Sequence, residues 1–148
     1  MNCLLCQSDS LISSPRSLGP HDEDFQCPVC GHYQMSFELQ VDRDITKDNR
    51  PLLAALSAAT KQANAVGKIL RLTLENYFPT AEAHRWTPVS RKFMKVLEVC
   101  QKRSSHFGAR FALDFRVDYP LLDAITPEEG WALICHVREE QLISAPSC

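Results

Sequence analysis

The sequence lacks the features that would place it in a membrane or an export pathway. No apolar run in its 148 residues approaches the roughly eighteen residues that a membrane-spanning helix needs. The segment from Met1 to Gln7 has neither the basic start nor the apolar core of a signal peptide. We therefore expect a cytoplasmic protein whose cysteine thiols stay reduced.

Familiar catalytic motifs are also missing. The chain has no glycine-rich phosphate loop, no serine nucleophile elbow, no HExxH sequence and no pair of catalytic carboxylates in a known motif. It also has no internal repeat and no low-complexity tract. From these absences we expect a protein that is not an enzyme, and no small-molecule substrate can be named for it.

The chain lacks a strong overall charge, but its charges are unevenly distributed. The net charge is −2 and the pI is about 6.2, without the basic excess of most duplex-binding proteins. Residues 1–40 have a net charge of −4, residues 61–116 of +7 and residues 117–148 of −5. A basic middle between two acidic ends predicts electrostatic contacts, either with a partner or between copies of the chain.

Against these absences, the sequence has two closely spaced cysteine pairs near its start. Two residues lie between Cys3 and Cys6, two lie between Cys27 and Cys30, and twenty residues separate the pairs. Such spacing lets one tight turn aim two sulfurs at one ion, and two turns complete a tetrahedron. We predict one Zn²⁺ per chain with these four ligands. Iron in the purified protein, two disulfides or four free thiols are the alternatives.

The residues around the cysteines refine this prediction. Gly31 follows the second pair and suits a turn that needs a positive φ, whereas Gln7 follows the first pair. We therefore expect the first turn to be less regular than the second. His21 and His32 are close enough in sequence to replace a cysteine, but we expect them to be exposed or to support the ligands indirectly.

Alternating apolar residues after the second pair predict a half-buried strand. The apolar positions are Tyr33, Met35, Phe37 and Leu39. Turn, long arm, turn and strand is the order of a zinc ribbon, in which metal binding supplies folding energy. We assign residues 1–41 to a zinc ribbon and residues 42–148 to a second domain.

The second domain is predicted to be mostly helical. Apolar periodicity predicts helices over 51–66, 91–103 and about 127–141, the last opened by a capping box at 126–129. Residues 111–117 alternate between apolar and polar and predict a strand. Helix, strand and capped helix follow the order of a winged-helix core. The expected fold class is therefore α+β, mainly α, with a zinc ribbon packed on a helical or winged-helix-like body.

Together these features resemble small zinc-ribbon modules of uncharacterised bacterial proteins. The resemblance rests on the two cysteine pairs, the Ala/Leu-rich helix after them, and three later segments: Asp118-Tyr119-Pro120-Leu121, Thr126-Pro127-Glu128-Glu129 and Glu140-Gln141-Leu142-Ile143. Such modules often precede an effector or sensor domain in prokaryotic defence systems, which implies an adaptor role here. A second similarity is to two-domain antitoxins with an N-terminal zinc ribbon.

Two functions fit this sequence. One is an adaptor that binds a protein partner or a second copy of the chain. The alternative is a regulator that binds nucleic acid through basic residues of 91–116, namely Arg91, Lys92, Lys95, Lys102, Arg103, Arg110 and Arg116. We prefer the adaptor, because the last predicted helix carries Glu128, Glu129, Glu139 and Glu140 and is a poor surface for entering a groove.

Two further Cys–His pairs invite a second metal site or a cysteine nucleophile. They are Cys100 with His106 and Cys135 with His136. Both cysteines lie on apolar helical faces, where cysteine packs as a small hydrophobic residue. We therefore expect packing roles for both, and likewise a core position for Trp131.

Overall fold

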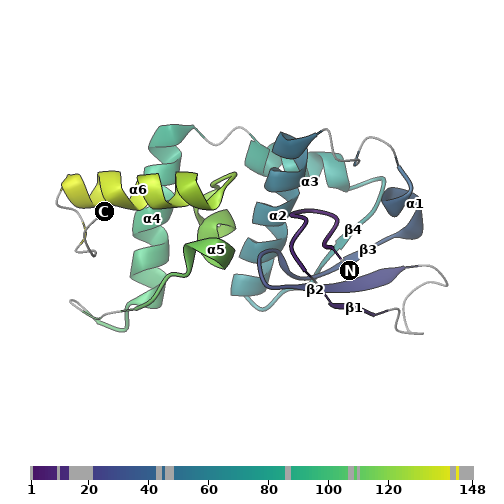
Figure 1. The fold of residues 1–148 in the computed structure, drawn as a ribbon, viewed down its shortest axis with the longest axis horizontal. Coiled ribbons are helices and arrows are strands. Elements are labelled where there is room, and N and C mark those ends of the chain that lie inside the picture. The colour runs from purple at the N-terminus through teal and green to yellow at the C-terminus, as the bar shows by residue number, and fades with distance from the viewer. Residues whose placement is uncertain are drawn as a thin grey trace. The chain divides into compact units, whose positions relative to one another are not determined.

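The chain forms an α+β protein with more helix than strand (Figure 1). This computed structural model describes residues 2–9, 11–13, 22–42, 45, 49–85, 88–106, 109, 111–140 and 143. The chain divides into two compact units, residues 1–86 and 87–148. The boundary drawn from the sequence after residue 41 falls inside the first unit, because the long helix that follows it packs on the cysteine-bearing sheet.

A small four-stranded sheet is the centre of the first unit. Its strands are β1 (Leu11–Ser13), β2 (Glu23–Cys27), β3 (Gly31–Met35) and β4 (Leu70–Leu72), in the order β1-β2-β3-β4. The first three are antiparallel, and β4 is parallel to β3. The predicted strand after the second cysteine pair is therefore confirmed as β3. It ends sooner than expected, because Phe37 already belongs to the short helix α1 (Phe37–Gln40).

The two faces of this sheet differ sharply in chemistry. On one face Phe25, Tyr33 and Met35 are fully buried, and the rings of Phe25 and Tyr33 stack with centroids 4.9 Å apart. On the other face Asp24 pairs in register with Gln34. Strand residues point alternately to the two faces, so a period of two in the sequence becomes one apolar and one polar surface.

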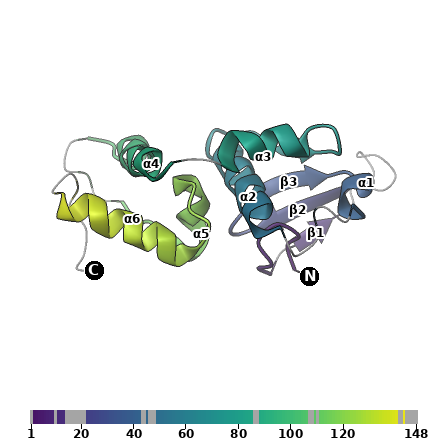
Figure 2. The ribbon, with the colours of Figure 1, turned by 90° about the horizontal axis from the view of Figure 1, so that it is seen from above.

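Helix α2 (Arg50–Ala65) covers the apolar side of the first unit. Pro51 lies in its first turn, where a missing N–H costs nothing, and the chain leaves it at Gly67 with a φ of +74°. Its buried residues are Leu52, Leu53, Ala55, Leu56, Ser57, Ala58, Ala59 and Thr60. It packs on β3 and β4, and α3 (Tyr77–Arg85) packs on it in turn (Figure 2). The predicted helix over 51–66 is confirmed.

All regular secondary structure among the described residues of the second unit is helical. It contains α4 (Val89–Arg103), α5 (Phe115–Asp118), a 3-10 helix (Tyr119–Leu122) and α6 (Pro127–Glu139). Their shared core consists of Val96, Leu122, Ala124, Leu133, Ile134 and Val137. Trp131 is half-buried, and its ring lies edge-on to Phe115, which packs against this core.

The predicted capping box opens α6 as expected. The Thr126 hydroxyl oxygen accepts the backbone N–H of Glu129 at 3.2 Å, and Glu129 Oε2 accepts the backbone N–H of Ile125 at 2.7 Å. Side chains thus satisfy N–H groups that have no partner inside the helix. The local sequence signal was sufficient here because all of its partners lie within five residues.

The strand predicted over 111–117 is wrong. Residues 111–114 have no regular secondary structure, and Phe115 begins helix α5. Asp114 caps that helix by accepting the backbone N–H of Arg116, and Asp118 Oδ2 accepts the N–H of Asp114. Such local side-chain bonds compete with strand pairing. Without this strand, the winged-helix prediction is not confirmed.

Across the described part of the chain, no helix is both long enough and apolar enough to cross a membrane.

Candidate metal centre

The four cysteines predicted as ligands meet at one end of the sheet. Cys3 and Cys6 form the first cysteine turn (residues 3–6), which precedes β1. Cys27 ends β2 and Cys30 directly precedes β3, so the second cysteine turn (residues 27–30) is the hairpin between those strands. All four Sγ atoms lie within 4.8 Å of one another.

The sulfur–sulfur distances suit a tetrahedral ion. Cys3 Sγ lies 3.7 Å from Cys30 Sγ, and Cys6 Sγ lies 3.4 Å from Cys27 Sγ. A tetrahedron with metal–sulfur bonds of about 2.3 Å has sulfur–sulfur edges of roughly 3.8 Å. Each of these two contacts joins one turn to the other, so the group could hold one metal ion between the turns. An all-thiolate donor set is consistent with zinc and is also suited to iron.

The two cysteine turns share an unusual backbone conformation. The residue after the second cysteine is left-handed in both, with a φ of +64° at Gln7 and +81° at Gly31. The first turn is therefore built like the second, contrary to our expectation of a less regular one. Gln7 adopts this conformation although its side chain makes it costlier than for glycine, and its N–H reaches the carbonyl oxygen of Cys3 at 2.9 Å.

The closeness of the four thiols shifts their pKa values in opposite directions. Hydrogen bonds from Cys3, Cys30 and Cys6 hold the pKa of Cys27 well below its usual range. The pKa of Cys30 is raised, chiefly because this thiol hydrogen-bonds to Cys27 and then to Cys3 and Cys6. The four thiols therefore titrate as one coupled group and not independently. A divalent cation among the sulfurs would favour the thiolate form of all four.

Hydroxyl groups surround the sulfurs, and the sequence had not pointed to them. Tyr33 Oη lies 3.2 Å from Cys3 Sγ, and Ser57 Oγ lies 3.1 Å from Cys30 Sγ. Ser8 Oγ lies 2.9 Å from Cys6 Sγ and 3.2 Å from Cys27 Sγ. Burial, followed by the charge of Cys3, raises the pKa of Tyr33, so this phenol keeps its proton. Every sulfur of the group thus has a hydroxyl within hydrogen-bonding distance.

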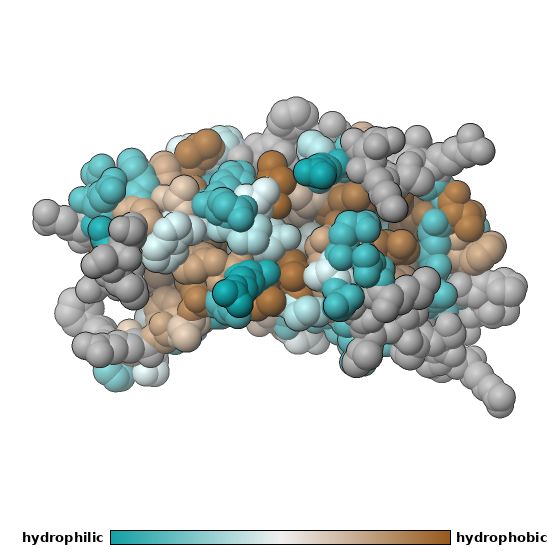
Figure 3. Space-filling model, viewed as in Figure 1, coloured by the Kyte–Doolittle hydropathy of each residue, from teal (hydrophilic) through white to brown (hydrophobic). Residues whose placement is uncertain are grey.

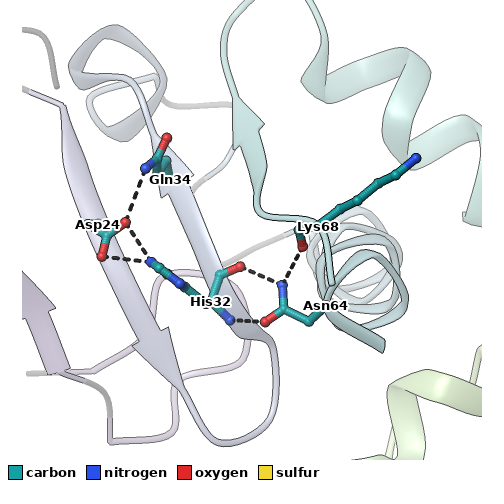
Figure 4. A network of polar contacts seen from close by, with 5 residues as sticks. All are labelled: Asp24, His32, Gln34, Asn64 and Lys68. Carbon is teal, nitrogen blue, oxygen red and sulfur yellow. Dashed lines mark hydrogen bonds and ion pairs between the residues drawn. The ribbon is translucent and has the colours of Figure 1, made fainter. Parts of the chain in front are cut away.

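His32 is not a ligand but belongs to the polar face of the sheet. Its Nε2 lies 2.7 Å and 2.8 Å from the two carboxylate oxygens of Asp24, to which Gln34 also donates at 3.3 Å (Figure 4). Its backbone is held by Asn64 of α2, which accepts the N–H of His32 at 2.5 Å and donates to its carbonyl at 2.6 Å. These contacts join His32 to Asp24 and Asn64 and not to a cysteine sulfur, so a supporting role for His32 stays a prediction. The other candidate, His21, lies outside the described residues.

Three of the basic residues of 91–116 form ion pairs within the second unit. Lys92 is buried and its Nζ lies 2.5 Å from Glu129 Oε1, while Arg103 Nη1 lies 3.1 Å from Asp118 Oδ2. Lys95 faces Glu98 one turn along α4, with Nζ and Oε2 3.7 Å apart. The exposed members of the set are Arg91, Lys102, Arg103 and Arg116, and Arg110 lies outside the described residues.

The surroundings of the two further Cys–His pairs oppose a cysteine nucleophile. Cys100 is half-buried against the core of the second unit, and burial raises the pKa of its thiol. His106 is exposed. Cys135 is disulfide-bonded, contrary to our expectation that the cysteine thiols stay reduced, and the ring of the neighbouring His136 stacks on Phe93 with centroids 4.6 Å apart. A raised thiol pKa and a disulfide both oppose the thiolate that a nucleophile needs.

Comparisons of the chain with protein-family models, with curated proteins and with solved structures gave no match. The functional interpretation therefore starts from the geometry of the four cysteines, the groups that surround them and the exposed surface.

Proposed function

We propose that the four cysteines hold one structural zinc ion per chain. The observation that carries this proposal is the closed arrangement of the sulfurs: Cys3, Cys27 and Cys30 are buried, and all four Sγ atoms converge on one point. A structural zinc site uses four protein ligands, whereas a catalytic one leaves a position open for water or substrate. The proposed role is therefore to fold and stiffen the first unit, not to perform chemistry.

Metal analysis of the purified chain tests this proposal. We expect about one zinc per chain, as four thiolates can complete one tetrahedral site. A Cys27→Ser protein should lose the metal, whereas a Cys100→Ser protein, changed outside the cluster, should keep it. Iron in place of zinc would correct the identity of the metal. Absence of both metals from the wild-type protein would refute the metal centre.

We propose that the chain as a whole is a non-enzymatic adaptor that binds a second copy of itself. Its first unit exposes large apolar side chains, which are Phe37, Val41, Val66, Ile69, Leu74 and Phe78. Apolar residues reach the surface in the region of α1 (Figure 3). The chain also carries opposite charges in separate segments, so two copies can complement each other. Exposed apolar groups combined with charge complementarity favour a protein partner.

Nucleic-acid binding is the second candidate, and it draws on the exposed Arg91, Lys102 and Arg116. The ion pairs Lys92–Glu129 and Arg103–Asp118 weigh against it, because cations that already face carboxylates contribute less to binding phosphate. The context of bacterial defence or sensing, implied by the resemblance to small zinc-ribbon modules, stays a prediction.

One experiment separates the two candidates. Light scattering over a range of concentrations measures self-association, and titration with short duplex and single-stranded DNA and RNA at two salt concentrations measures nucleic-acid binding. We expect a dimer that Val41→Asp weakens strongly and that Arg91→Glu/Lys102→Glu weakens less, because burial of apolar side chains contributes most of the contact energy. A monomer at every concentration would refute self-association. Salt-sensitive binding of nucleic acid, lost in Arg91→Glu/Lys102→Glu, would replace the adaptor by the second candidate.

A further inference from the structure

Two of the hydroxyls around the sulfurs come from the core of the first unit and not from the cysteine turns. Ser57 belongs to α2 and Tyr33 to β3, and both side chains are almost completely buried. Their oxygens lie 3.1 Å from Cys30 Sγ and 3.2 Å from Cys3 Sγ. A thiolate has no proton to give, so each hydroxyl must be the donor when the cysteines bind a metal.

These hydrogen-bond donors compensate negative charge at the proposed site. Four thiolates around one divalent ion leave an excess of negative charge, and three of these sulfurs are shielded from water. Buried charge is costly unless hydrogen bonds compensate it. Hydrogen bonds to charged acceptors are stronger than those between neutral groups. The hydroxyls of Ser57 and Tyr33 therefore stabilise the two sulfurs that water reaches least.

Helix α2 holds its donor in place through a polar row on one face. Ser57, Lys61 and Asn64 are spaced by four and three residues, so they lie along the same side of the helix. Lys61 Nζ donates to the carbonyl oxygen of Pro28 at 2.9 Å, and the Asn64 amide pairs with the backbone of His32. Ser57 and Lys61 thus contact the second cysteine turn, and Asn64 contacts His32, two residues beyond it.

Gly31, which directly follows this turn, lies close against the same helix. A Cβ atom at Gly31 would lie 2.6 Å from Asn64 Oδ1, too close for any side chain. The amide of Asn64 also donates to the carbonyl oxygen of Lys68 just past the end of α2 (Figure 4). One side chain therefore joins the end of the helix to the exit of the turn.

We propose that Ser57 and Tyr33 are positioning residues of the metal centre, which makes α2 its third structural part beside the two cysteine turns. This inference rests on the proposed zinc site and deepens it. Metal binding and the docking of α2 then depend on each other, because the thiolates need the donor of the helix and the helix is seated on the turn that the metal closes.

Cobalt binding to the full-length chain tests this inference, with Co²⁺ as the probe and Zn²⁺ as its competitor. We expect Ser57→Ala and Tyr33→Phe each to weaken Co²⁺ binding by about 10–100-fold, the usual effect of losing a hydrogen bond to a ligand. The sulfur-to-cobalt charge-transfer band should move to longer wavelength, because a thiolate that accepts one hydrogen bond fewer gives up its electron more easily.

Thr60→Val is the matched control. Thr60 is fully buried on the same helix, and its hydroxyl donates to the carbonyl oxygen of Ser57 at 3.0 Å instead of to a sulfur. This variant loses a buried hydroxyl of α2 as Ser57→Ala does, and should keep the affinity and the spectrum of the wild type. If Thr60→Val shifts both as strongly as Ser57→Ala, loss of packing explains the effect and the inference is wrong.

The remaining outcomes separate the two proposals. A wild-type chain that binds neither Co²⁺ nor Zn²⁺ refutes the metal centre itself. A wild-type chain that binds them, with Ser57→Ala and Tyr33→Phe unchanged in affinity and spectrum, refutes only the positioning role. If Ser57→Ala does not fold, Tyr33→Phe decides, because it keeps the ring that stacks on Phe25.

Discussion

The buried core of the first unit includes a group of cysteine sulfurs, whereas the core of the second unit consists of aliphatic side chains. In the first unit Cys3 and Cys30 are as buried as Phe25 and Tyr33, so the proposed metal site is part of the core itself. In the second, Val96, Leu122 and Val137 pack together without a metal cluster among the described residues. Both units have fewer than a hundred residues and therefore small cores, which the first supplements with the proposed metal site and the second fills with aliphatic packing.

The difference extends to how each unit orders its polar groups. In the first unit hydroxyls and an asparagine side chain are directed at the cysteine turns, across 27 to 32 residues of sequence. In the second, the capping bonds of Thr126 and Glu129 span three or four residues, and only the ion pair of Lys92 with Glu129 among those described above spans more than 30. The long-range contacts of the first unit should therefore be lost together when the metal is removed. The local contacts of the second unit should be lost one at a time.

The largest effect is expected from breaking the metal site. Cys30→Ser removes a buried sulfur and should unfold the first unit, because binding of a structural zinc is worth about 10–16 kcal/mol in isolated zinc-binding peptides. Two-dimensional NMR of the full chain should show collapsed dispersion for residues 2–85 and native shifts for the second unit. A Cys30→Ser protein with native shifts in the first unit contradicts a metal-dependent core.

The converse change should damage only the second unit. Leu122 is 1% exposed and lies in the aliphatic core. Leu122→Ala should lower the free energy of unfolding of that unit by about 2–5 kcal/mol through lost burial and a cavity. Urea unfolding in a Trp86→Phe background, followed by Trp131 fluorescence, measures this loss, and Co²⁺ binding to the first unit should stay as in the wild type. Weakened Co²⁺ binding would mean that the units are not independent.

A smaller effect is expected where the second cysteine turn meets α2. Gly31→Ala places a side chain at a φ of +81° and a Cβ only 2.6 Å from Asn64 Oδ1. The backbone strain costs about 1–2 kcal/mol, and each hydrogen bond lost from Asn64 adds about 1 kcal/mol. Thermal unfolding of the zinc-loaded chain should show the loss. Gly67→Ala is the control, since Gly67 has a similar φ but no atom near its Cβ position, so the excess of Gly31→Ala over it reports the clash.

The cap of α6 provides a modest local effect. Thr126→Ala removes the oxygen that accepts the N–H of Glu129 and should cost about 1 kcal/mol. Thr126→Ser keeps that oxygen and should retain most of the stability. Urea unfolding of the second unit compares the two variants. Equal losses in both would show that the methyl group of Thr126, and not its hydroxyl, stabilises the helix start.

The smallest effect should be a gain. Gln7→Gly relieves the left-handed residue of the first cysteine turn, at a φ of +64°. We expect the first unit to gain up to about 1 kcal/mol, because glycine adopts this conformation without the steric cost. The melting temperature of the zinc-loaded protein measures it. A clear loss of stability would show that the Gln7 side chain, whose Nε2 lies 3.4 Å from the carbonyl oxygen of Leu4, matters more than its backbone.

These contrasts also explain which parts the sequence could predict. The cysteine turns, α2 and the cap of α6 are each encoded within a few neighbouring residues, by spacing, by helical periodicity and by Thr126 with Glu129. The alternation of apolar and polar residues over 111–117 wrongly predicted a strand. Asp114 and Asp118 instead accept hydrogen bonds from nearby backbone N–H groups and favour a helix start. Period-two patterning becomes a strand only where another strand is available to pair with it.

The groups that complete the candidate site could not be found this way. Ser57 and Asn64 lie on a helix whose apolar periodicity dominates its pattern, and each meets a residue 27 or 32 positions earlier in the chain. Tyr33 gave the signal of an apolar strand position, and its hydroxyl contact with Cys3 depends on how the first turn returns to the sheet. Such contacts follow from tertiary packing and leave no local signature.

Amide hydrogen exchange before and after removal of the metal tests the central claim most directly. The claim is that one metal ion organises the first unit and not the second. We expect about one zinc per chain in the purified protein. After a strong chelator strips it, exchange protection should vanish in β2, β3 and α2 and persist in α4 and α6. Protection of β2, β3 and α2 that survives complete removal of the metal would contradict the claim.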